Sequence, residues 1–127
     1  MIKVNPNNID VSSIKKAARV IKEGGLVAFP TETVYGLGAN AFDSKAVARI
    51  FEVKKRPLED SLIVHISKRE DLFKLAKDIS NTALKLTREF WPGPLTVVIR
   101  KSDIVPDIGD ICKYFITTGR MAMFILT

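Results

Sequence analysis

Short apolar segments of strand length alternate along this chain with longer segments whose apolar residues recur every three to four positions. Helices are predicted at 11–23, at 44–54, after a capping box formed by Ser67 and Glu70, and from Ser80 or Asn81 up to Pro92. Strands are predicted at 26–29, 62–66, 95–100 and 121–126. Because helices and strands alternate, we expect an α/β domain with a mixed sheet flanked by helices.

Helix ends and buried stripes can also be inferred from the sequence. The predicted N-caps are Asp10 or Ser12 for the first helix, Asp43 for the second, and Ser80 or Asn81 for the last. The residues predicted to face inward in the second and third helices are Val47, Ile50, Phe51, Val53, Leu72, Phe73 and Leu75. The pair Gly24-Gly25 is predicted to end the first helix, because glycine readily adopts the left-handed backbone found there.

Length and composition limit the classes of protein that fit. The 127 residues can bury one core and are too few for two, so one domain is expected over 1–127. The longest apolar runs are of strand length, and residues 1–10 lack the apolar region of a secretory signal. We therefore expect a cytoplasmic protein without a membrane partner. The single cysteine, Cys112, excludes an intramolecular disulfide and a cysteine-cluster metal site.

The chain is basic, with 20 basic and 14 acidic side chains and a formal net charge of +6. Such a balance favours polyanionic partners such as nucleotide phosphates or RNA. The basic residues are spread along the sequence, however, and those of the first helix fall on its polar side, where a solvated face is the usual interpretation. Charge therefore permits an RNA partner without identifying one.

The segment 24–38, GGLVAFPTETVYGLG, is the first candidate binding segment. Its strand delivers the following residues to a sheet edge, where α/β proteins commonly bind ligands. The P-T-E-T residues offer hydroxyls and a carboxylate, and Gly36 and Gly38 allow the backbone to approach a ligand closely. Neither G-x-G-x-x-G nor a Walker A lysine is present. A capped turn explains every residue except Glu32 and Tyr35, and composition alone favours that interpretation.

The second candidate is the segment 54–57, KKRP. Pro57 disfavours helix at Arg56, so Lys54 and Arg56 are expected on an extended segment from which both side chains reach one anionic ligand. A guanidinium and an ammonium group both suit phosphates. Favourable charge at the C-terminus of the second helix explains these residues equally well.

His65, the only histidine, and Trp91 are the remaining candidates. Alternation along the strand places His65 with Ile63, on the face opposite Val64 and Ile66. A lone strand histidine is more often a hydrogen-bonded core residue than a catalyst, although its position at the carboxyl end of the strand favours a site. An aromatic residue at a helix end usually belongs to the core, so a structural role is expected for Trp91 rather than stacking on a base.

Taken in order, these segments resemble the YrdC-like family of threonylcarbamoyl-AMP synthases. GGLVAFPTETVYGLG is similar to the opening motif of the family, KKRP to its K-x-R motif, and LIVHI and FWPGPLTVVI to further family segments. The resemblance runs from about residue 14 to residue 105, and P-T-E-T-V-Y-G-L-G is a long and specific match. It implies a twisted, open YrdC-like sheet with a large positively charged cavity.

The resemblance also implies a reaction, a nucleotidyl transfer. Family members convert L-threonine, bicarbonate and ATP, with Mg²⁺, into threonylcarbamoyl-AMP and pyrophosphate, and downstream transfer proteins use the product to modify tRNA (t6A). Thr31 and His65 are then expected to bind L-threonine, and Lys54, Arg56 and Arg120 to bind ATP. The resemblance identifies no metal ligand in the protein. Because the threonine carbamate can attack the α-phosphate itself, no catalytic nucleophile is expected, and positioning and charge neutralisation suffice.

The sequence departs from the family pattern toward its C-terminus. Phe124 stands where the family has an arginine that meets the threonine carboxylate, and the later serine–asparagine motif is absent. Asp60-Ser61 replaces the usual asparagine–proline. We therefore expect the N-terminal part of a C-terminally truncated family domain, weakly active or inactive alone. The alternatives are a YrdC-like module that binds nucleotide, tRNA or double-stranded RNA without catalysis, and an inactive fragment.

Overall fold

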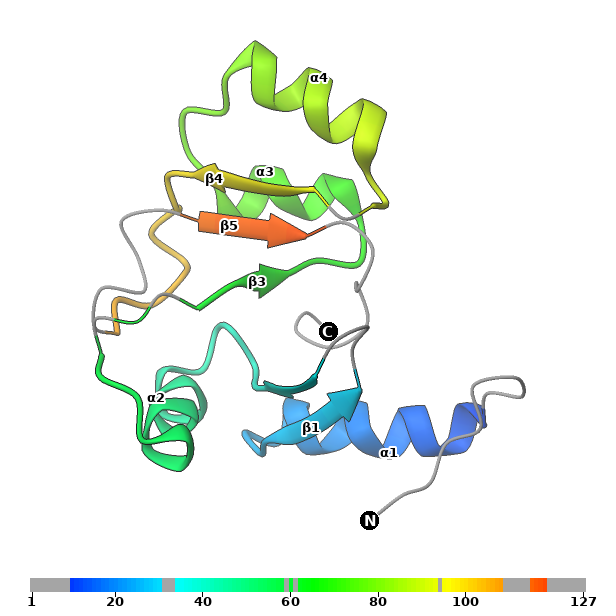
Figure 1. Cartoon of the computed structure of the whole chain (residues 1–127), viewed down its shortest axis with the longest axis vertical. Helices are drawn as coiled ribbons and strands as arrows, with labels where there is room; N and C mark the ends of the chain where they lie inside the picture. The colour runs from blue at the N-terminus through cyan, green and yellow to red at the C-terminus, as the bar shows by residue number, and fades with distance from the viewer. Residues whose placement is uncertain are drawn as a thin grey trace.

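The computed structural model describes residues 10–30, 34–58, 60, 62–93 and 95–108, together with the backbone of 115–118. Over these residues the chain forms an α/β fold with two sheets (Figure 1). A two-stranded hairpin and two helices occupy the lower half of Figure 1, and a three-stranded sheet with the remaining helices lies above them. Within this described part, no helix has the length and apolar character needed to span a bilayer.

The N-terminal part packs a helix against a hairpin. Helix α1 (Val11–Lys22) leads into β1 (Val27–Pro30), which pairs antiparallel with β2 (Tyr35–Gly38). Phe29 lies opposite Gly36, and a Cβ atom on Gly36 or Gly38 would come within 2.8 or 3.0 Å of the Phe29 ring. The close approach that we expected of a ligand at these glycines is made instead by an aromatic ring of the protein itself. Helix α2 (Ser44–Lys54) follows the hairpin.

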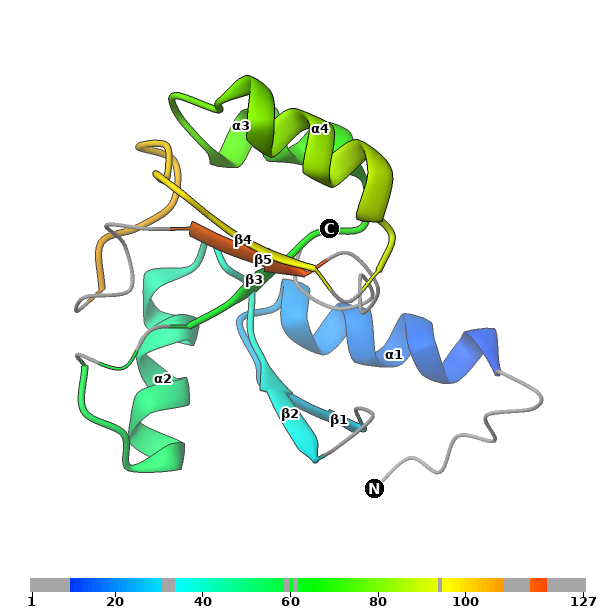
Figure 2. The ribbon, with the colours of Figure 1, turned by 45° about the horizontal axis from the view of Figure 1, so that its top comes forward.

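The three-stranded sheet is mixed, as predicted. Its order is β3 (Val64–His65), β5 (Phe115–Thr118), β4 (Thr96–Ile99), with β5 parallel to β3 and antiparallel to β4. Figure 2 shows α3 (Leu72–Leu75) and α4 (Asn81–Phe90) on one side of this sheet, with α1 and α2 on the other. A one-turn 3₁₀ helix, η1 (Arg69–Asp71), precedes α3. The core of this part includes Leu72, Leu75, Val64, Ile66 and Ile99, all buried.

Polar side chains cap three of the helices, as predicted. The carboxylate of Asp10 accepts hydrogen bonds from the backbone N–H groups of Ser12 and Ser13 at the start of α1. Asp43 and Ser80 accept in the same way from the first turns of α2 and α4. The hydroxyls of Ser13 and Ser12 also donate to Asp10, and these bonds hold the pKa of its carboxyl at about 2.

The predicted capping box does not form. Neither Ser67 nor Glu70 caps the third helix: the helical backbone begins with η1 at Arg69, Lys68 occupies the N-cap position, and no side chain bonds to the first turn. The predicted S-x-x-E pattern was wrong here because a 3₁₀ turn moves the helix start by one residue and changes which N–H groups are left without a partner.

Two predicted inward-facing residues point outward. The exposed fractions of Val53 and Phe73 are 62% and 59%. Val53 lies about 200° around α2 from Phe51, away from the buried stripe, and α3 is one turn long, so Leu72 and Leu75 fill its buried side. Strands β2 and β5 were not predicted. The predicted strand 121–126 lies outside the described residues, as do Cys112 and Phe124.

Candidate functional site

The KKRP segment forms the end of α2 rather than an extended strand. Lys54 is the last helical residue, and Lys55 takes a left-handed backbone conformation with φ 51° and ψ 40°. The N–H of Lys55 donates to the carbonyl of Glu52 at 3.2 Å, and the N–H of Arg56 donates to that of Phe51 at 3.0 Å. This pair of bonds is the Schellman motif. The predicted extended segment was therefore wrong for Lys54, which is helical, and for Lys55, which is left-handed. Arg56 lies outside the helix, as its position before Pro57 predicted.

A turn after α2 brings a carboxylate to Arg56. The N–H of Asp60 donates to the carbonyl of Pro57 at 3.2 Å, which closes a tight turn. The chain reverses there, and Asp60 Oδ2 lies 3.6 Å from Arg56 Nε in an ion pair. Both side chains are close to half exposed, at 44% for Arg56 and 46% for Asp60. Arg56 is therefore accessible to a ligand, but it is already in contact with an anion.

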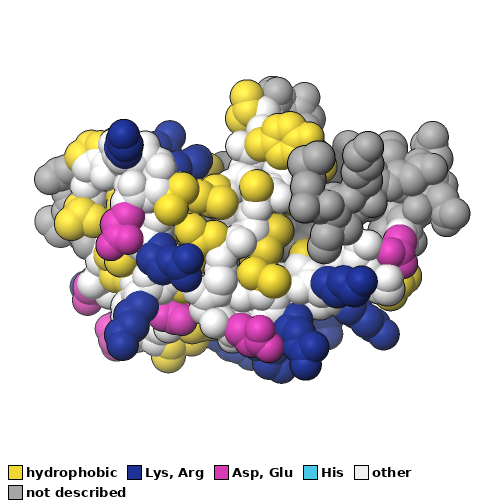
Figure 3. Space-filling model, turned by 90° about the horizontal axis from the view of Figure 1, so that it is seen from below, with side chains coloured by type: hydrophobic (Ala, Val, Ile, Leu, Met, Phe, Trp, Pro, Cys, Tyr) yellow, Lys and Arg dark blue, Asp and Glu magenta, His cyan; other side chains and the backbone are white. Residues whose placement is uncertain are grey.

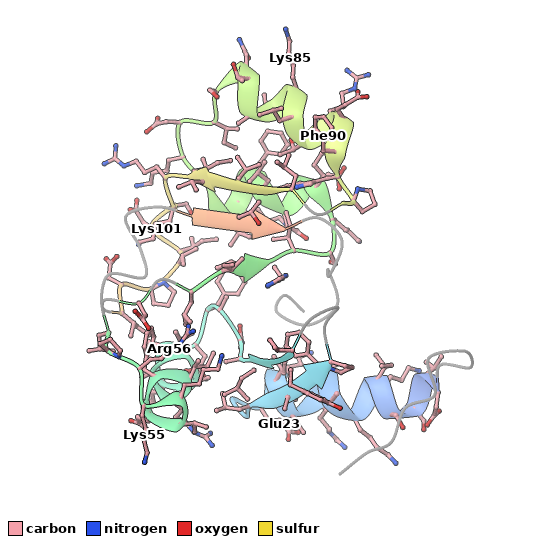
Figure 4. The ribbon with its side chains drawn as sticks, in the orientation of Figure 1. Glu23, Lys55, Arg56, Lys85, Phe90 and Lys101 are labelled. Atoms are coloured by element: carbon pink, nitrogen blue, oxygen red, sulfur yellow. The ribbon has the colours of Figure 1, made fainter. Side chains whose placement is uncertain are left out.

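The two lysines of the segment differ from Arg56. Lys54 and Lys55 are exposed, and neither forms an ion pair with any residue that the structure describes. Figure 4 shows Lys55 projecting from the lower end of α2, away from the three-stranded sheet, whereas the Arg56 side chain lies nearer to that sheet. Figure 3 shows other basic side chains scattered over the lower face with acidic ones among them, so no single basic patch dominates that face.

His65 occupies the position that alternation predicted. It is the last residue of β3, its side chain is half-buried, and Val64 and Ile66 beside it are buried in the core. Ile63, which shares the face of His65, has an exposed fraction of 43%. His65 is therefore a half-buried side chain at the carboxyl end of a strand, a position where α/β proteins commonly bind ligands.

The described residues do not bring all the predicted site residues together. In Figures 1 and 2 the carboxyl ends of β1 and β3 point to the same side of the molecule, and the end of α2 with Lys54 and Arg56 lies toward the other side. Thr31 follows β1 directly in sequence, but Thr31 and Arg120 lie outside the described residues.

Sequence reasoning missed a small hollow beyond the end of β3. It measures about 100 Å³ and is lined by Ile66, Ser67, Lys68, Arg69, Trp91 and Pro92. The indole N–H of Trp91 donates to the carbonyl of Leu95 at 2.8 Å, and Trp91 packs on the core, which confirms its structural role. A nucleotide needs several times this volume, so the hollow alone is not a nucleotide site. The signal in the sequence was the basic pair Lys68-Arg69, which follows the end of a strand within a few residues.

The described residues contain no group of three or more His, Cys, Asp or Glu side chains placed to hold a metal ion. Magnesium usually binds through substrate phosphates and one or two carboxylates, not through a cage made wholly of protein groups. Asp60 is the carboxylate that the structure places beside the predicted phosphate-binding arginine.

Comparison with known proteins confirms the resemblance. The Sua5/YciO/YrdC family model, described as telomere recombination, matches residues 19–119. The chain is 57% identical over 100 residues to a threonylcarbamoyl-AMP synthase of Pyrococcus abyssi, covering 79% of this chain and 29% of that protein. It is 40% identical over 91 residues to that of Pseudomonas paraeruginosa, covering 72% and 49%. The chain thus spans less than half the length of these curated relatives.

The fold agrees with solved structures. The crystal structure of P. abyssi Sua5 complexed with L-threonine matches with a TM-score of 0.82 at 52% identity, covering 87% of this chain and 33% of that one. E. coli YciO matches with a TM-score of 0.75 at 22% identity, which shows a shared fold alone. The described chain therefore shares its overall fold with the matched part of these proteins.

Proposed function

Because the chain belongs to the Sua5/YciO/YrdC family, we propose that it takes part in making threonylcarbamoyl-AMP and pyrophosphate from L-threonine, bicarbonate and ATP. The observation that carries the proposal is the 57% identity to a threonylcarbamoyl-AMP synthase over 79% of the chain. The structure of its relative with L-threonine supports an amino-acid substrate. The reaction transfers a nucleotidyl group, and we place it in the cytoplasm.

We propose that Lys54 and Arg56 bind the phosphates of ATP. The C-terminus of a helix carries partial negative charge, which repels phosphates, so side-chain cations must supply the attraction there. KKRP places three cationic residues at the end of α2, all of them exposed. The guanidinium of Arg56 suits a bidentate contact with phosphate, and Lys54 adds a point charge. Arg120 is a further proposed ATP contact, by resemblance alone.

We propose that Thr31 and His65 bind L-threonine. His65 supports this because it is half-buried at the carboxyl end of a strand. Thr31 follows β1, whose carboxyl end points to the same side of the molecule as that of β3 (Figure 1). L-Threonine and the β- and γ-phosphates then lie on opposite sides of the α-phosphorus that the threonine carbamate attacks. In the product the threonylcarbamoyl group is bonded to the α-phosphate of AMP, and the other two phosphates have left as pyrophosphate.

The proposed chemistry needs no protein nucleophile. The threonine amine and bicarbonate first form a carbamate with loss of water. A carbamate oxygen then attacks the α-phosphorus of ATP, the bond from that phosphorus to the β-bridging oxygen breaks, and pyrophosphate leaves with the electron pair. Arg56 and Lys54 hold the leaving phosphates and neutralise the charge that develops on them. Mg²⁺ bound to ATP would supply further charge neutralisation at the phosphates that Lys54 and Arg56 hold.

The proposed product serves tRNA modification, and downstream transfer proteins that act on tRNA are the proposed partners. A second function, binding of tRNA or double-stranded RNA without catalysis, is supported by the net charge of +6. The two functions differ in a simple assay. Release of pyrophosphate that depends on threonine indicates the enzyme, and salt-sensitive RNA binding without pyrophosphate release indicates the binding module. Since the chain spans less than half of its relatives, we expect at most weak turnover from it alone.

ATP binding tests the proposed site independently of turnover. Arg56→Ala is expected to weaken ATP binding by about 10- to 100-fold, because a charge-assisted hydrogen bond contributes about 1.5–3 kcal/mol. Lys16→Ala, an exposed cation on α1, serves as the control and should leave ATP affinity unchanged. Calorimetric titration measures both. Equal ATP affinity of the wild-type chain and Arg56→Ala would remove the phosphate site from the end of α2.

A further inference from the structure

The Arg56 guanidinium is engaged by a carboxylate before any ligand arrives. The turn closed by Pro57 and Asp60 fixes the backbone that carries Asp60, and Oδ2 of that residue lies 3.6 Å from Arg56 Nε. The pairing follows from the local chain path, because these residues are close in sequence and the turn reverses direction between them. The exposed fractions, 44% and 46%, show that solvent and ligands can reach both groups.

We infer that Asp60 competes with the ATP phosphates for Arg56 and so sets the affinity of the site for polyphosphates. This inference rests on the proposed function. A guanidinium binds phosphate best through two parallel N–H groups, and a carboxylate beside Nε occupies one of the edges that offer such a pair. The negative charge of Asp60 also repels an incoming polyanion. A ligand at Arg56 must therefore displace Asp60 or use the remaining edge.

Asp60 acts on Arg56 and not on the whole motif. Among the described residues, Asp60 forms an ion pair with Arg56, and neither Lys54 nor Lys55 forms one. An exposed ion pair is weak and is screened by salt. Removing the carboxylate is therefore expected to tighten ATP binding about two- to fivefold at low ionic strength, with a smaller gain at high ionic strength.

A double-mutant cycle on the chain tests this assignment. ATP and inorganic tripolyphosphate are titrated calorimetrically into the wild-type chain, D60N, R56Q and the double variant, at about 20 and 300 mM salt. D60N is expected to bind both probes two- to fivefold more tightly, and D60S, which also lacks the charge, should do the same. The gain should disappear in the R56Q background. D103N removes a carboxylate paired with Lys77, far along the chain from KKRP, and is expected to leave both affinities unchanged.

The outcomes separate this inference from the proposed function. If R56Q weakens ATP binding but neither D60N nor D60S tightens it, Asp60 does not compete and the inference fails while the phosphate site stands. The inference also fails, and the phosphate site stands, if D60N tightens ATP binding equally in the R56Q background. Asp60 would then repel the ligand through its charge alone and not by occupying Arg56. If R56Q changes nothing, or if neither the wild-type chain nor D60N binds ATP, the proposed site fails and the inference with it. Thermal unfolding of each variant confirms that the affinities refer to folded protein.

Discussion

Helices α1 and α2 end in the same hydrogen-bonded motif but place different residues in its left-handed position. At the end of α1 the residue is Gly24, with φ 79°, and the N–H of Gly25 donates to the Val20 carbonyl at 2.8 Å. At the end of α2 the residue is Lys55, with φ 51°, followed by Arg56. A side chain in this conformation costs about 1–2 kcal/mol, and glycine avoids that cost.

The difference indicates what each helix end is for. At α1 the two glycines allow close packing. Gly25 lies against Val20, and Arg49 of α2 donates a hydrogen bond to the Gly24 carbonyl at 3.2 Å, which joins the two helices. At α2 the left-handed residue is an exposed lysine between two other cations. Local stability does not explain that choice. Backbone strain that concentrates charge beside an exposed arginine is typical of a binding site.

The largest expected effect comes from the residue after the left-handed position. In Gly25→Ala the new Cβ would lie 2.5 Å from Val20 Cγ1 and 2.8 Å from its carbonyl oxygen, so the backbone must shift. We expect the free energy of unfolding to fall by about 1–3 kcal/mol. The matched variant in α2, Arg56→Ala, is exposed and should change it by less than about 0.5 kcal/mol. Urea denaturation measures both, and equal losses would show that packing does not distinguish the two helix ends.

Exchanging the left-handed residues tests whether the backbone at Lys55 is strained. Lys55→Gly should raise the free energy of unfolding by about 0.5–1 kcal/mol, because it removes the strain, and Gly24→Lys should lower it by about 1–2 kcal/mol. Lys54→Gly removes the same charge from a helical position and should lower it by about 0.5–1 kcal/mol. Urea denaturation again provides the measurement. If Lys55→Gly destabilises the chain as much as Lys54→Gly does, Lys55 is not strained.

The same two helix ends show how far sequence reasoning reaches. The pair Gly24-Gly25 predicted the end of α1, because glycine adopts the left-handed backbone without steric strain. KKRP has no glycine that would mark a left-handed helix end. The effect of Pro57 on the preceding residue predicted an extended segment, but the backbone hydrogen bonds donated by Lys55 and Arg56 close the helix end at Lys54 and Lys55. The contents of the candidate site therefore followed from sequence and resemblance. Its geometry, including the Arg56–Asp60 pair, depended on a turn that no local pattern specified.

Pairing between strands explains why β2 and β5 were not predicted. Strand β2 holds two glycines, which are poor strand formers, and it exists because it pairs with β1 and receives the Phe29 ring. Strand β5 pairs with β3 and β4, which lie far from it in sequence. Most helix starts, by contrast, depend on neighbouring residues: Asp43 was predicted as a cap, and Asp10 and Ser80 were each one of two residues predicted at a helix start.

The N-termini of α1 and α2 extend the comparison to a smaller effect. Both begin with an aspartate cap, but Asp10 accepts hydroxyl hydrogen bonds from Ser13 at 2.6 Å and Ser12 at 2.9 Å in addition to backbone bonds. These bonds lower its pKa from 3.8 to about 2. A carboxyl whose pKa is lower in the folded than in the unfolded chain stabilises the fold fully above the unfolded value. That contribution is lost as the pH falls from about 4 toward 2.

Ser13→Ala removes the strongest of these bonds, so we expect the Asp10 pKa to rise toward 3.8 and the loss of stability to begin at a higher pH. Ser44→Ala changes the residue that follows Asp43, the cap of α2, and should leave the Asp10 pKa unchanged. Carboxyl-carbon NMR titration measures the pKa directly, and thermal unfolding between pH 2 and 5 measures its consequence. An Asp10 pKa that stays near 2 in Ser13→Ala would show that the backbone N–H groups alone hold the charge. The caps of α1 and α2 would then work in the same way, and only the C-terminal ends of the two helices would differ.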